Sequence, residues 1–425
     1  MDSPSRDRRW LIIADDLTGA ADSAIAFARR RLPARVTWGE PRIDEPSDAV
    51  AVAFDADSRQ QSGVSAARRH RDILQRLLAP ETRVFKKIDS TLRGHPAEEI
   101  GAMIDVLAAR RPRLCSIVAS AFPAGGRITR GGRVFVHGIP LEHTEFWDAA
   151  RPADQADLPA LLETAGLHAR LIPLDVVRGA PARLRALFDD ARGEAVICVC
   201  DAEVEADLDR IAVAGLEGDS TFFAGSAGLA HSLARLASLD ADRRLDPVVG
   251  VPSRRGALLV VGSQAGPSRA ALAPLESFAD VRRLSVNARS LVHSPESDDP
   301  IPLAELERAI ADGVDVLIDV APPDDGALAG APRVVEALAR RIAPLAANAS
   351  ALMATGGDTA AALLAQCRVR GIRLVDELEP GTSLGLTLGA LTVPVITKSG
   401  GFGDAGSLRR ILERLRFIRQ TGTVA

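Results

Sequence analysis

Short apolar runs alternate with amphipathic segments along this chain, and this alternation is the feature that most limits its possible folds. Runs rich in Val, Ile, Ala and Leu are typical of strands buried on both faces, and the segments between them have the spacing of helices that cover a sheet. The pattern predicts an α/β fold with a mainly parallel sheet flanked by helices. In the first half of the chain the predicted strands are 10–14, 49–54, 83–88, 114–119, 195–200 and 221–224.

The length of 425 residues predicts two or three domains, of which two large ones are the arrangement we look for, since single hydrophobic cores stop growing at roughly 250–300 residues. A charged stretch with Pro and Gly, LDADRRLDPVVGVPSRRG, follows a predicted helix at 228–238 and interrupts the pattern. We therefore place a first domain at 1–238, a linker at 239–256 and a second domain at 257–425. The pattern then restarts, with strands at 257–261, 315–320, 351–354 and 393–397 and helices at 268–278, 302–312, 331–348, from about 358, and at 405–418.

Charge and cysteine content argue against several classes of protein. A net charge of −4 does not indicate a nucleic-acid-binding surface, and no apolar run approaches the roughly 18 residues of a membrane span. The N-terminus lacks an apolar signal segment, so we predict a cytoplasmic protein with small-molecule partners and leave open whether it forms a homo-oligomer. The four cysteines and seven histidines show no metal-ligand spacing, so we predict no metal ion held by protein ligands alone.

Polar residues follow the predicted strands of the first domain, and two adjacent aspartates, Asp15 and Asp16, follow the first of them directly. In open α/β sheets, ligands bind beyond the carboxyl ends of the strands. These polar residues therefore outline a ligand site. A glycine-rich segment at 125–142 departs from the strand and helix rhythm, and we predict a hairpin there.

Three predicted strand-to-helix turns of the second domain are rich in small residues: VVGSQAGPSR (260–269), MATGGDTAAALL (353–364) and VITKSGGFGDAGSL (395–408). Glycine lets backbone N–H groups approach an anion, and the following helix contributes the positive end of its dipole. None of the turns matches a P-loop or a dinucleotide-binding motif, but together they indicate a nucleotide site. Asp358 would repel a triphosphate unless it binds a ribose hydroxyl or faces the phosphates through Mg²⁺.

Only three of the 52 basic residues are lysines: Lys86, Lys87 and Lys398. A lysine ammonium is a compact point charge that can reach a phosphate or a hydroxyl, whereas an arginine binds as a planar fork. Because the three lie in FKKIDSTLRG and ITKSGGFGD, at predicted strand ends, we interpret them as site residues. The alternative is chance or codon bias.

With these motifs, the chain resembles the four-carbon acid sugar kinase family, whose members phosphorylate tetronate-type sugar acids with ATP. The resemblance spans nearly the whole chain and rests on ADDLTGAAD, DADSR (55–59), KKIDSTLRG, FPAGGRITRGGRVFVHGIPL, GSAGLA, GSQAGPS, TGGDTAA, the GTSLG turn (381–385) and TKSGGFG. It implies a sugar-acid-binding first domain and a nucleotide-binding second domain, with the active site in the cleft between them. The segment 142–162 departs from the family pattern, because the spacing after its Thr is altered and a serine is missing, so the sequence does not identify the sugar acid.

Carried over motif by motif, the resemblance implies the residues of both sites. Contacts to the sugar acid are expected from Asp15, Asp16, Arg59, Lys87, Ile88, Asp89, Ser90 and Arg93. Contacts to ATP, which would carry Mg²⁺, are expected from Ser263, Gly356, Gly357, Asp358, Thr359, Gly400, Gly401 and Gly403.

For a polyhydroxy acid, basic residues and serine suit the carboxylate and aspartates suit the hydroxyl groups. We expect Asp16 to accept the proton of the attacking hydroxyl as a general base and Asp15 to make a supporting bond. The alternative is that Asp16 only caps the helix starting near Thr18. Lys398 is expected as a catalytic residue near the transferred phosphoryl group, unless it only neutralises its strand end. Closure across the linker at 239–256 is expected to bring the two ligands together.

Two other functions remain open. A non-catalytic sugar-acid-binding regulator could use the site of the first domain, but the three phosphate-type turns would then have no role. An NAD-dependent sugar-acid oxidoreductase is also a two-domain α/β protein, but it should carry G-x-G-x-x-G after an early strand, where this chain has ADDLTGA.

Overall fold

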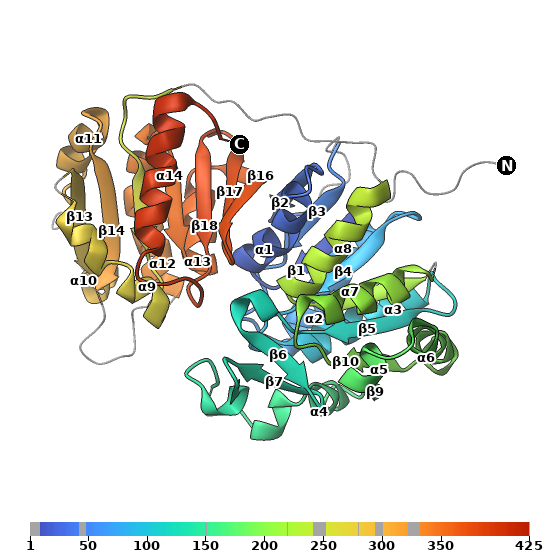
Figure 1. Cartoon of the computed structure of the whole chain (residues 1–425). Helices are drawn as coiled ribbons and strands as arrows, with labels where there is room; N and C mark the ends of the chain where they lie inside the picture. The colour runs from blue at the N-terminus through green and yellow to red at the C-terminus, as the bar shows by residue number, and fades with distance from the viewer. Residues whose placement is uncertain are drawn as a thin grey trace. The chain divides into compact units, whose positions relative to one another are not determined.

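The computed structural model describes residues 9–41, 48–148, 151–218, 220–240, 252–278, 280–293, 301–321 and 332–424. The chain divides into two compact units (Figure 1). The first consists of Met1–Ala34 and Trp38–Leu245, and the second of Arg35–Thr37 and Asp246–Ala425. The predicted linker at 239–256 lies mostly outside the described residues.

The first unit contains parallel strands in the order β3-β1-β4-β11-β5-β10-β9. Their order reverses direction after β1, which is the kind of switch point where α/β sheets bind ligands. The register places Ala14 of β1 opposite Asp55 of β3, and Ile13 opposite Lys86 of β4. The carboxyl ends of these three strands therefore lie side by side. The strands are β1 (Trp10–Ala14), β3 (Ala51–Asp55), β4 (Arg83–Lys87), β5 (Cys115–Ala119), β9 (Ala169–Ile172), β10 (Ile197–Cys200) and β11 (Thr221–Gly225).

Helices cover both faces of this sheet, because successive strand residues point to opposite sides. Phe222 belongs to a core cluster with residues of α2, α3 and α4, whereas Phe223 packs on Trp10, which also contacts Phe27 of α1. Helices α1, α8, α7 and α6 pack successively on one another. The helices are α1 (Leu17–Ala28), α2 (Gly63–Leu77), α3 (Pro96–Ala108), α4 (Leu158–Glu163), α5 (Leu174–Val177), α6 (Pro181–Glu194), α7 (Glu205–Leu216) and α8 (Ala227–Asp240).

The glycine-rich segment at 125–142 forms the predicted antiparallel excursion. Strands β6 (Arg127–Arg130), β7 (Arg133–Val136) and β8 (Ile139–Pro140) pair as a small separate sheet. The backbone N–H groups of Gly131 and Gly132 donate to the Asp201 carboxylate at 2.7 and 2.9 Å, which fixes the β6–β7 turn against the end of β10.

The second unit contains strands in the order β13-β14-β12-β15-β18-β17-β16-β2. The pairs from β13 to β18 are parallel and those from β18 to β2 are antiparallel. The strands are β2 (Ala34–Thr37), β12 (Leu258–Val261), β13 (Val281–Asn287), β14 (Asp315–Ala321), β15 (Leu352–Thr355), β16 (Val369–Glu379), β17 (Thr382–Gly389) and β18 (Pro394–Lys398). The helices are α9 (Gly266–Ala270), α10 (Ala288–His293), α11 (Leu303–Ala311), α12 (Pro332–Asn348), α13 (Gly357–Gln366) and α14 (Ser407–Thr421).

Two sequence expectations for the second unit were wrong. The helix predicted at 268–278 is broken into α9 and a 3₁₀ turn at Ala273–Ser277, because Pro274 cannot donate the backbone hydrogen bond that would continue α9. The GTSLG segment is mainly a strand: Gly381 forms the turn with φ +76°, and Thr382 begins β17 between β16 and β18.

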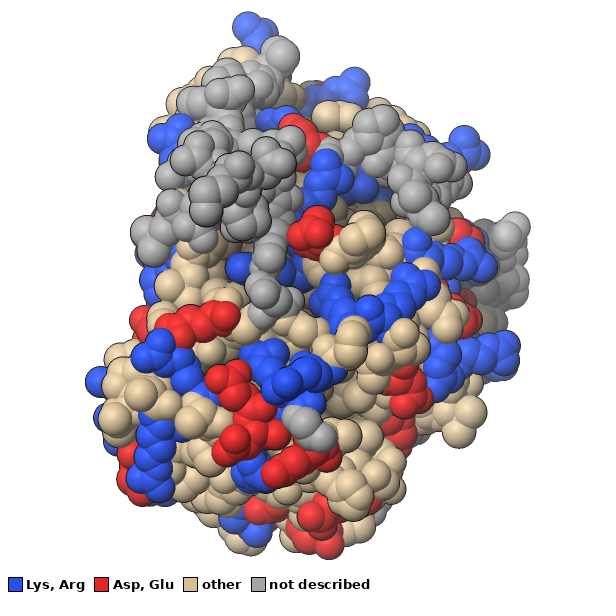
Figure 2. All heavy atoms as spheres, turned by 90° about the vertical axis from the view of Figure 1, so that its right-hand side faces the viewer, with Lys and Arg blue, Asp and Glu red and all other residues tan. Residues whose placement is uncertain are grey.

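Figure 2 shows basic and acidic side chains interspersed on one face of the molecule. Among the described residues, no helix is both long and apolar enough to cross a membrane.

Candidate active site

Asp16 follows β1 and caps helix α1. Its backbone is extended, and its Oδ1 accepts a hydrogen bond from the Gly19 N–H at 2.8 Å while Oδ2 accepts one from the Thr18 hydroxyl at 2.8 Å. The helix therefore begins here because Asp16 satisfies its first free amides. Asp16 thus makes the capping contact expected in the alternative interpretation, and its role as a general base stays a prediction. Its carboxylate is 7 % exposed and lies beside other polar groups, so a chemical role is compatible with the cap.

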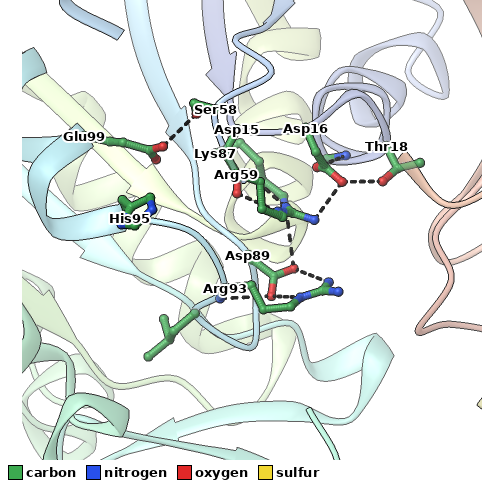
Figure 3. A network of polar contacts seen from close by, with 12 residues as sticks. Asp15, Asp16, Thr18, Ser58, Arg59, Lys87, Asp89, Arg93, His95 and Glu99 are labelled. Carbon is green, nitrogen blue, oxygen red and sulfur yellow. Dashed lines mark hydrogen bonds and ion pairs between the residues drawn. The ribbon is translucent and has the colours of Figure 1, made fainter. Parts of the chain in front are cut away.

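Arg59 joins the two aspartates after β1 (Figure 3). Its Nε and Nη2 donate to the two oxygens of Asp15 at 2.7 and 2.9 Å, and its Nη1 donates to Asp16 Oδ2 at 2.7 Å. Burial alone raises the pKa of Asp15, but the positive charges of Arg59, Lys86 and Lys87 outweigh burial. The pKa of Asp15 is therefore below its ordinary value. The Arg59 guanidinium thus holds the aspartates in place, with part of its donor capacity left over.

The loop after β4 is organised by Asp89. Its carboxylate accepts from the Thr91 N–H at 3.1 Å and from the Thr91 hydroxyl, and it forms a two-pronged ion pair with Arg93 Nε and Nη2 at 2.9 and 2.8 Å. Burial alone raises the pKa of Asp89, but the charge and hydrogen bonds of Arg93 outweigh it and lower the pKa well below its ordinary value. Arg59 Nη2 lies 3.9 Å from Asp89 Oδ1, so the aspartates and arginines form one network.

Lys87 stands out within this network. Its side chain is 4 % exposed, yet its ammonium makes no hydrogen bond or ion pair within 4 Å to any residue that the structure describes. A Cβ atom at Gly19 would lie 2.5 Å from Asp16 Oδ1 and 3.3 Å from Lys87 Nζ, so both groups border the same point above the start of α1. Because the ammonium has no close protein partner, an anionic ligand at this point would gain a charge-assisted contact with it.

Ser90 and Ile88, which are also expected to contact the sugar acid, differ in the groups that they leave available to a ligand. Ser90 is buried next to Asp89, and its hydroxyl has no hydrogen-bond partner among the described residues. Ile88 packs in the hydrophobic core, and its N–H donates to the Gly225 carbonyl at 2.9 Å, so only its carbonyl remains for a ligand contact.

Sequence reasoning missed two groups near this network. Asp55 ends β3 and accepts from the Asp57 N–H at 2.8 Å; burial, and then the negative charges of Asp16, Asp57 and Asp15, raise its pKa well above the ordinary value. Arg151 donates to the Leu92 carbonyl at 2.7 Å and stacks over Trp147 at 4.5 Å, which anchors the divergent 142–162 segment on the Asp89 loop. The polar residue after a strand was the available signal for Asp55, whereas no local pattern marks Arg151.

The three small-residue turns of the second unit come together at the carboxyl ends of β12, β15 and β18, which are neighbours in the sheet. A Cβ atom at Gly262 would lie 2.1 Å from Thr359 Oγ1, and one at Gly400 would lie 2.1 Å from Ser263 Oγ. The Gly356 N–H donates to the Lys398 carbonyl at 2.9 Å. The turns therefore pack closely into one glycine-lined surface, because a side chain at Gly262 or Gly400 would collide with the neighbouring turn.

Helix α13 points its N-terminus at this surface. Its first residue follows Gly356, which has φ +88° and provides no side-chain cap, so the first N–H groups of the helix remain for a ligand. Asp358 is exposed in the first turn, and Thr359 is buried beneath it. Gly401 and Gly403 lie in the loop that follows β18, and Gly403 has φ +89°.

Lys398 is fully buried at the end of β18, and its ammonium donates to the carbonyls of Ser399 and Phe402 in the same loop. Burial lowers its pKa to about 8, and the charges of Glu379 and Asp404 oppose this shift. These contacts favour a role in shaping the glycine loop. Contact between Lys398 and a phosphoryl group stays a prediction.

Family models match both halves of the chain. Residues 10–233 match a model described as a sugar-binding N-terminal domain, and residues 258–408 match one described as a nucleotide-binding C-terminal domain. The network around Lys87 lies within the first match, and the glycine-lined surface within the second.

Curated relatives and solved structures are similar over nearly the full length. The chain is 37 % identical to a D-threonate kinase of Cupriavidus necator, covering 94 % of this chain and 96 % of the relative. It is 34 % identical to a D-threonate kinase of Bordetella bronchiseptica, with 96 % and 98 % covered, and 30 % identical to a D-erythronate kinase of Heliobacterium modesticaldum, with 93 % and 94 % covered.

Solved structures show the same fold. A Salmonella typhimurium protein superposes with a TM-score of 0.76 at 21 % identity, with 95 % of this chain and 98 % of that one covered. A Haemophilus influenzae protein superposes with a TM-score of 0.72 at 18 % identity, with 96 % and 100 % covered. The paired domain matches, together with full-length relatives at 30 % identity or more, show that the chain belongs to the four-carbon acid sugar kinase family.

Proposed function

We propose that this protein uses ATP to phosphorylate a hydroxyl group of a four-carbon sugar acid. The observation that carries the proposal is Lys87, a nearly fully buried residue whose ammonium lies near Asp15, Asp16 and Asp89 without a close partner among the described residues. A cation next to several hydrogen-bond acceptors suits a ligand that is both anionic and rich in hydroxyl groups. D-Threonate is the first substrate to test, because the relatives at 37 % and 34 % identity bear the name D-threonate kinase.

We assign the substrate-binding roles according to which side chains already have hydrogen-bond partners within the protein. Lys87 and the Ser90 hydroxyl bind the carboxylate, and Arg93, whose side chain is 43 % exposed, contributes a remaining N–H donor. Asp16 accepts a hydrogen bond from the hydroxyl that reacts. Arg59 and Asp15 fix the direction of the Asp16 carboxylate through the hydrogen bonds that Arg59 donates to both.

The reaction is an in-line phosphoryl transfer. The substrate oxygen forms a bond to the γ-phosphorus as the bond from that phosphorus to the leaving oxygen of ADP breaks, and the hydroxyl proton passes to Asp16. Such a transfer depends mainly on positioning and charge stabilisation. The hydrogen bonds that Arg59 donates to Asp15 and Asp16 provide that positioning on the substrate side.

ATP binds at the glycine-lined surface of the second unit. Its phosphates contact the N–H groups at the start of α13 and the loop with Gly400, Gly401 and Gly403, while Ser263 contributes a hydroxyl. The exposed carboxylate of Asp358 suits either a ribose hydroxyl or a Mg²⁺ ion carried by the nucleotide. Bound Mg²⁺ would neutralise phosphate charge.

A coupled assay of ADP production tests the function. The panel contains the D and L forms of threonate and erythronate and the 3-oxo-tetronates, with threitol as a substrate that lacks the carboxylate. We expect ADP release with at least one acid and none with threitol. ADP release that is independent of the acid, or equal with threitol, would contradict the proposal.

Lys87→Met provides the matched variant, since it keeps the side-chain length and removes the charge. We expect kcat/KM for the acid to fall by roughly ten- to a hundredfold while the Kd of ATP stays unchanged, because a charge-assisted contact contributes roughly 1.5–3 kcal/mol. Equal losses for both ligands would show that Lys87 is needed for folding instead.

A further inference from the structure

The two neighbouring lysines of β4 point to opposite sides of the sheet, as strand geometry requires. Lys86 is fully buried away from the Lys87 site, and its Nζ lies 2.8 Å from Glu99 Oε2 on α3. The same ammonium donates to the Lys87 carbonyl at 2.6 Å. Lys86 thus connects Glu99 to the end of the strand that carries Lys87.

The second oxygen of Glu99 reaches the loop that carries Arg59. Glu99 Oε1 accepts a hydrogen bond from the Ser58 hydroxyl at 2.8 Å, and Ser58 is fully buried (Figure 3). The backbone N–H groups of Ser58 and Arg59 both donate to the Asp15 carbonyl, at 3.0 and 3.2 Å. One carboxylate therefore links the carboxyl ends of β1, β3 and β4 from beneath.

We propose that Glu99 is a positioning residue whose two oxygens set the relative places of Arg59 and Lys87, and hence the sugar-acid site. The inference rests on the proposed function for its effect on catalysis, but its geometric part stands by itself. In this proposal Glu99 touches neither ligand and acts through Ser58 and Lys86, and its Oε1 also lies 3.7 Å from His70 Nδ1.

Stability alone is a poor explanation for this buried ion pair. Taking two charges out of water is costly, and well-packed apolar residues of similar volume often serve a core equally well or better. Glu99 is 1 % exposed, and two residues near it along α3, Ile100 and Met103, belong to the hydrophobic core. What apolar residues cannot supply is directed hydrogen bonds to two different loops.

The double variant Lys86→Met with Glu99→Leu separates positioning from stability, because it keeps the volume and removes both charges together. We expect a melting temperature close to that of the wild type. We also expect crystal structures to show the Arg59 and Lys87 side chains displaced or in altered rotamers. In the kinase assay, kcat/KM for the sugar acid should fall by about tenfold or more while KM for ATP stays unchanged.

Ser58→Ala removes only the hydrogen bond from the Ser58 hydroxyl to Glu99, and it should reproduce part of the loss in kcat/KM for the sugar acid. Asp105→Asn, on the exposed side of α3, is the control and should match the wild type. If Arg59 and Lys87 keep their places in the double variant, the inference is wrong, whatever the activity. If the wild type shows no kinase activity but Arg59 and Lys87 are displaced in the double variant, only the proposed function is overturned.

Discussion

At the scale of single residues, the three lysines that stood out in the sequence have three different environments. Lys87 is buried without a close partner among the described residues, Lys86 pairs with Glu99, and Lys398 donates to carbonyls of its own loop. The sequence could predict that lysine marks the ends of β4 and β18. It could not predict which ammonium would lack a close protein partner, because that depends on strand direction and on Glu99, which is distant in the sequence.

Asp16→Asn should abolish turnover while leaving ATP binding nearly intact. An asparagine can still accept the hydrogen bond from the Gly19 N–H, so α1 keeps its cap, but the residue can no longer take a proton. We expect kcat to fall by at least about a hundredfold, measured with saturating acid and ATP. Asp157→Asn, which changes the cap of α4 in the same way, should leave kcat unchanged. A parallel loss of ATP affinity in Asp16→Asn would mean that the residue is structural.

His70 should make the fold sensitive to acid. Burial lowers its pKa from 6.5 to about 4, although the nearby Glu99 charge opposes the shift. Between these pH values the unfolded chain binds more protons than the folded one, so the free energy of unfolding falls as the pH falls from 6.5 to 4, by about 3 kcal/mol from this group.

Denaturant unfolding of the wild type and His70→Gln across that pH range measures the effect. The difference in the free energy of unfolding between the two proteins should shrink by about that amount toward pH 4, while His143→Gln, at an exposed position, should follow the wild type. If the free energies of unfolding of the wild type and His70→Gln change in parallel with pH, His70 is not the cause of the acid sensitivity.

At the scale of elements, the buried parallel strands and the helices between them could be predicted from apolar periodicity, and β1 matches its predicted bounds. The missed strands are β2, β9, β13, β16 and β17. β2, β9 and β13 are only partly buried, and β16 carries several charged residues, so their sequences lack a continuous apolar run. Their positions are decided by pairing with distant strands.

Gly400→Ala should weaken nucleotide binding selectively. The new methyl group would lie 2.1 Å from Ser263 Oγ and 3.0 Å from Ser263 Cβ, so the two turns would have to move apart. We expect KM for ATP to rise by roughly tenfold, about 1.4 kcal/mol, with little change in KM for the sugar acid. Gly101→Ala is the matched control, because its methyl group would meet Leu167 at an ordinary 3.4 Å. An unchanged KM for ATP would argue against a nucleotide at these turns.

At the scale of the whole molecule, the order of the motifs could predict the family and the assignment of one ligand type to each half of the chain. It could not predict that Arg59 would be engaged by Asp15 and Asp16, or that the 142–162 segment would be anchored through Arg151. Both depend on contacts between segments that are far apart in the sequence.

Phosphoryl transfer requires both ligands at one place, so we expect the two units to close when both are bound. Small-angle X-ray scattering of Asp16→Asn, which prevents turnover, should show a smaller maximum dimension with the sugar acid and ATP together than with either alone. A dimension that does not change would count against closure.

The membership of Arg35–Thr37 in the second unit has a consequence for how the protein is made. Thr37 Oγ1 donates to the Arg370 carbonyl, 333 residues later, and β2 pairs with β16. The ribosome must therefore synthesise most of the polypeptide before β2 can pair with β16. A gene fragment that encodes only Asp246–Ala425 would lack β2 and leave the edge of β16 unpaired, open to self-association.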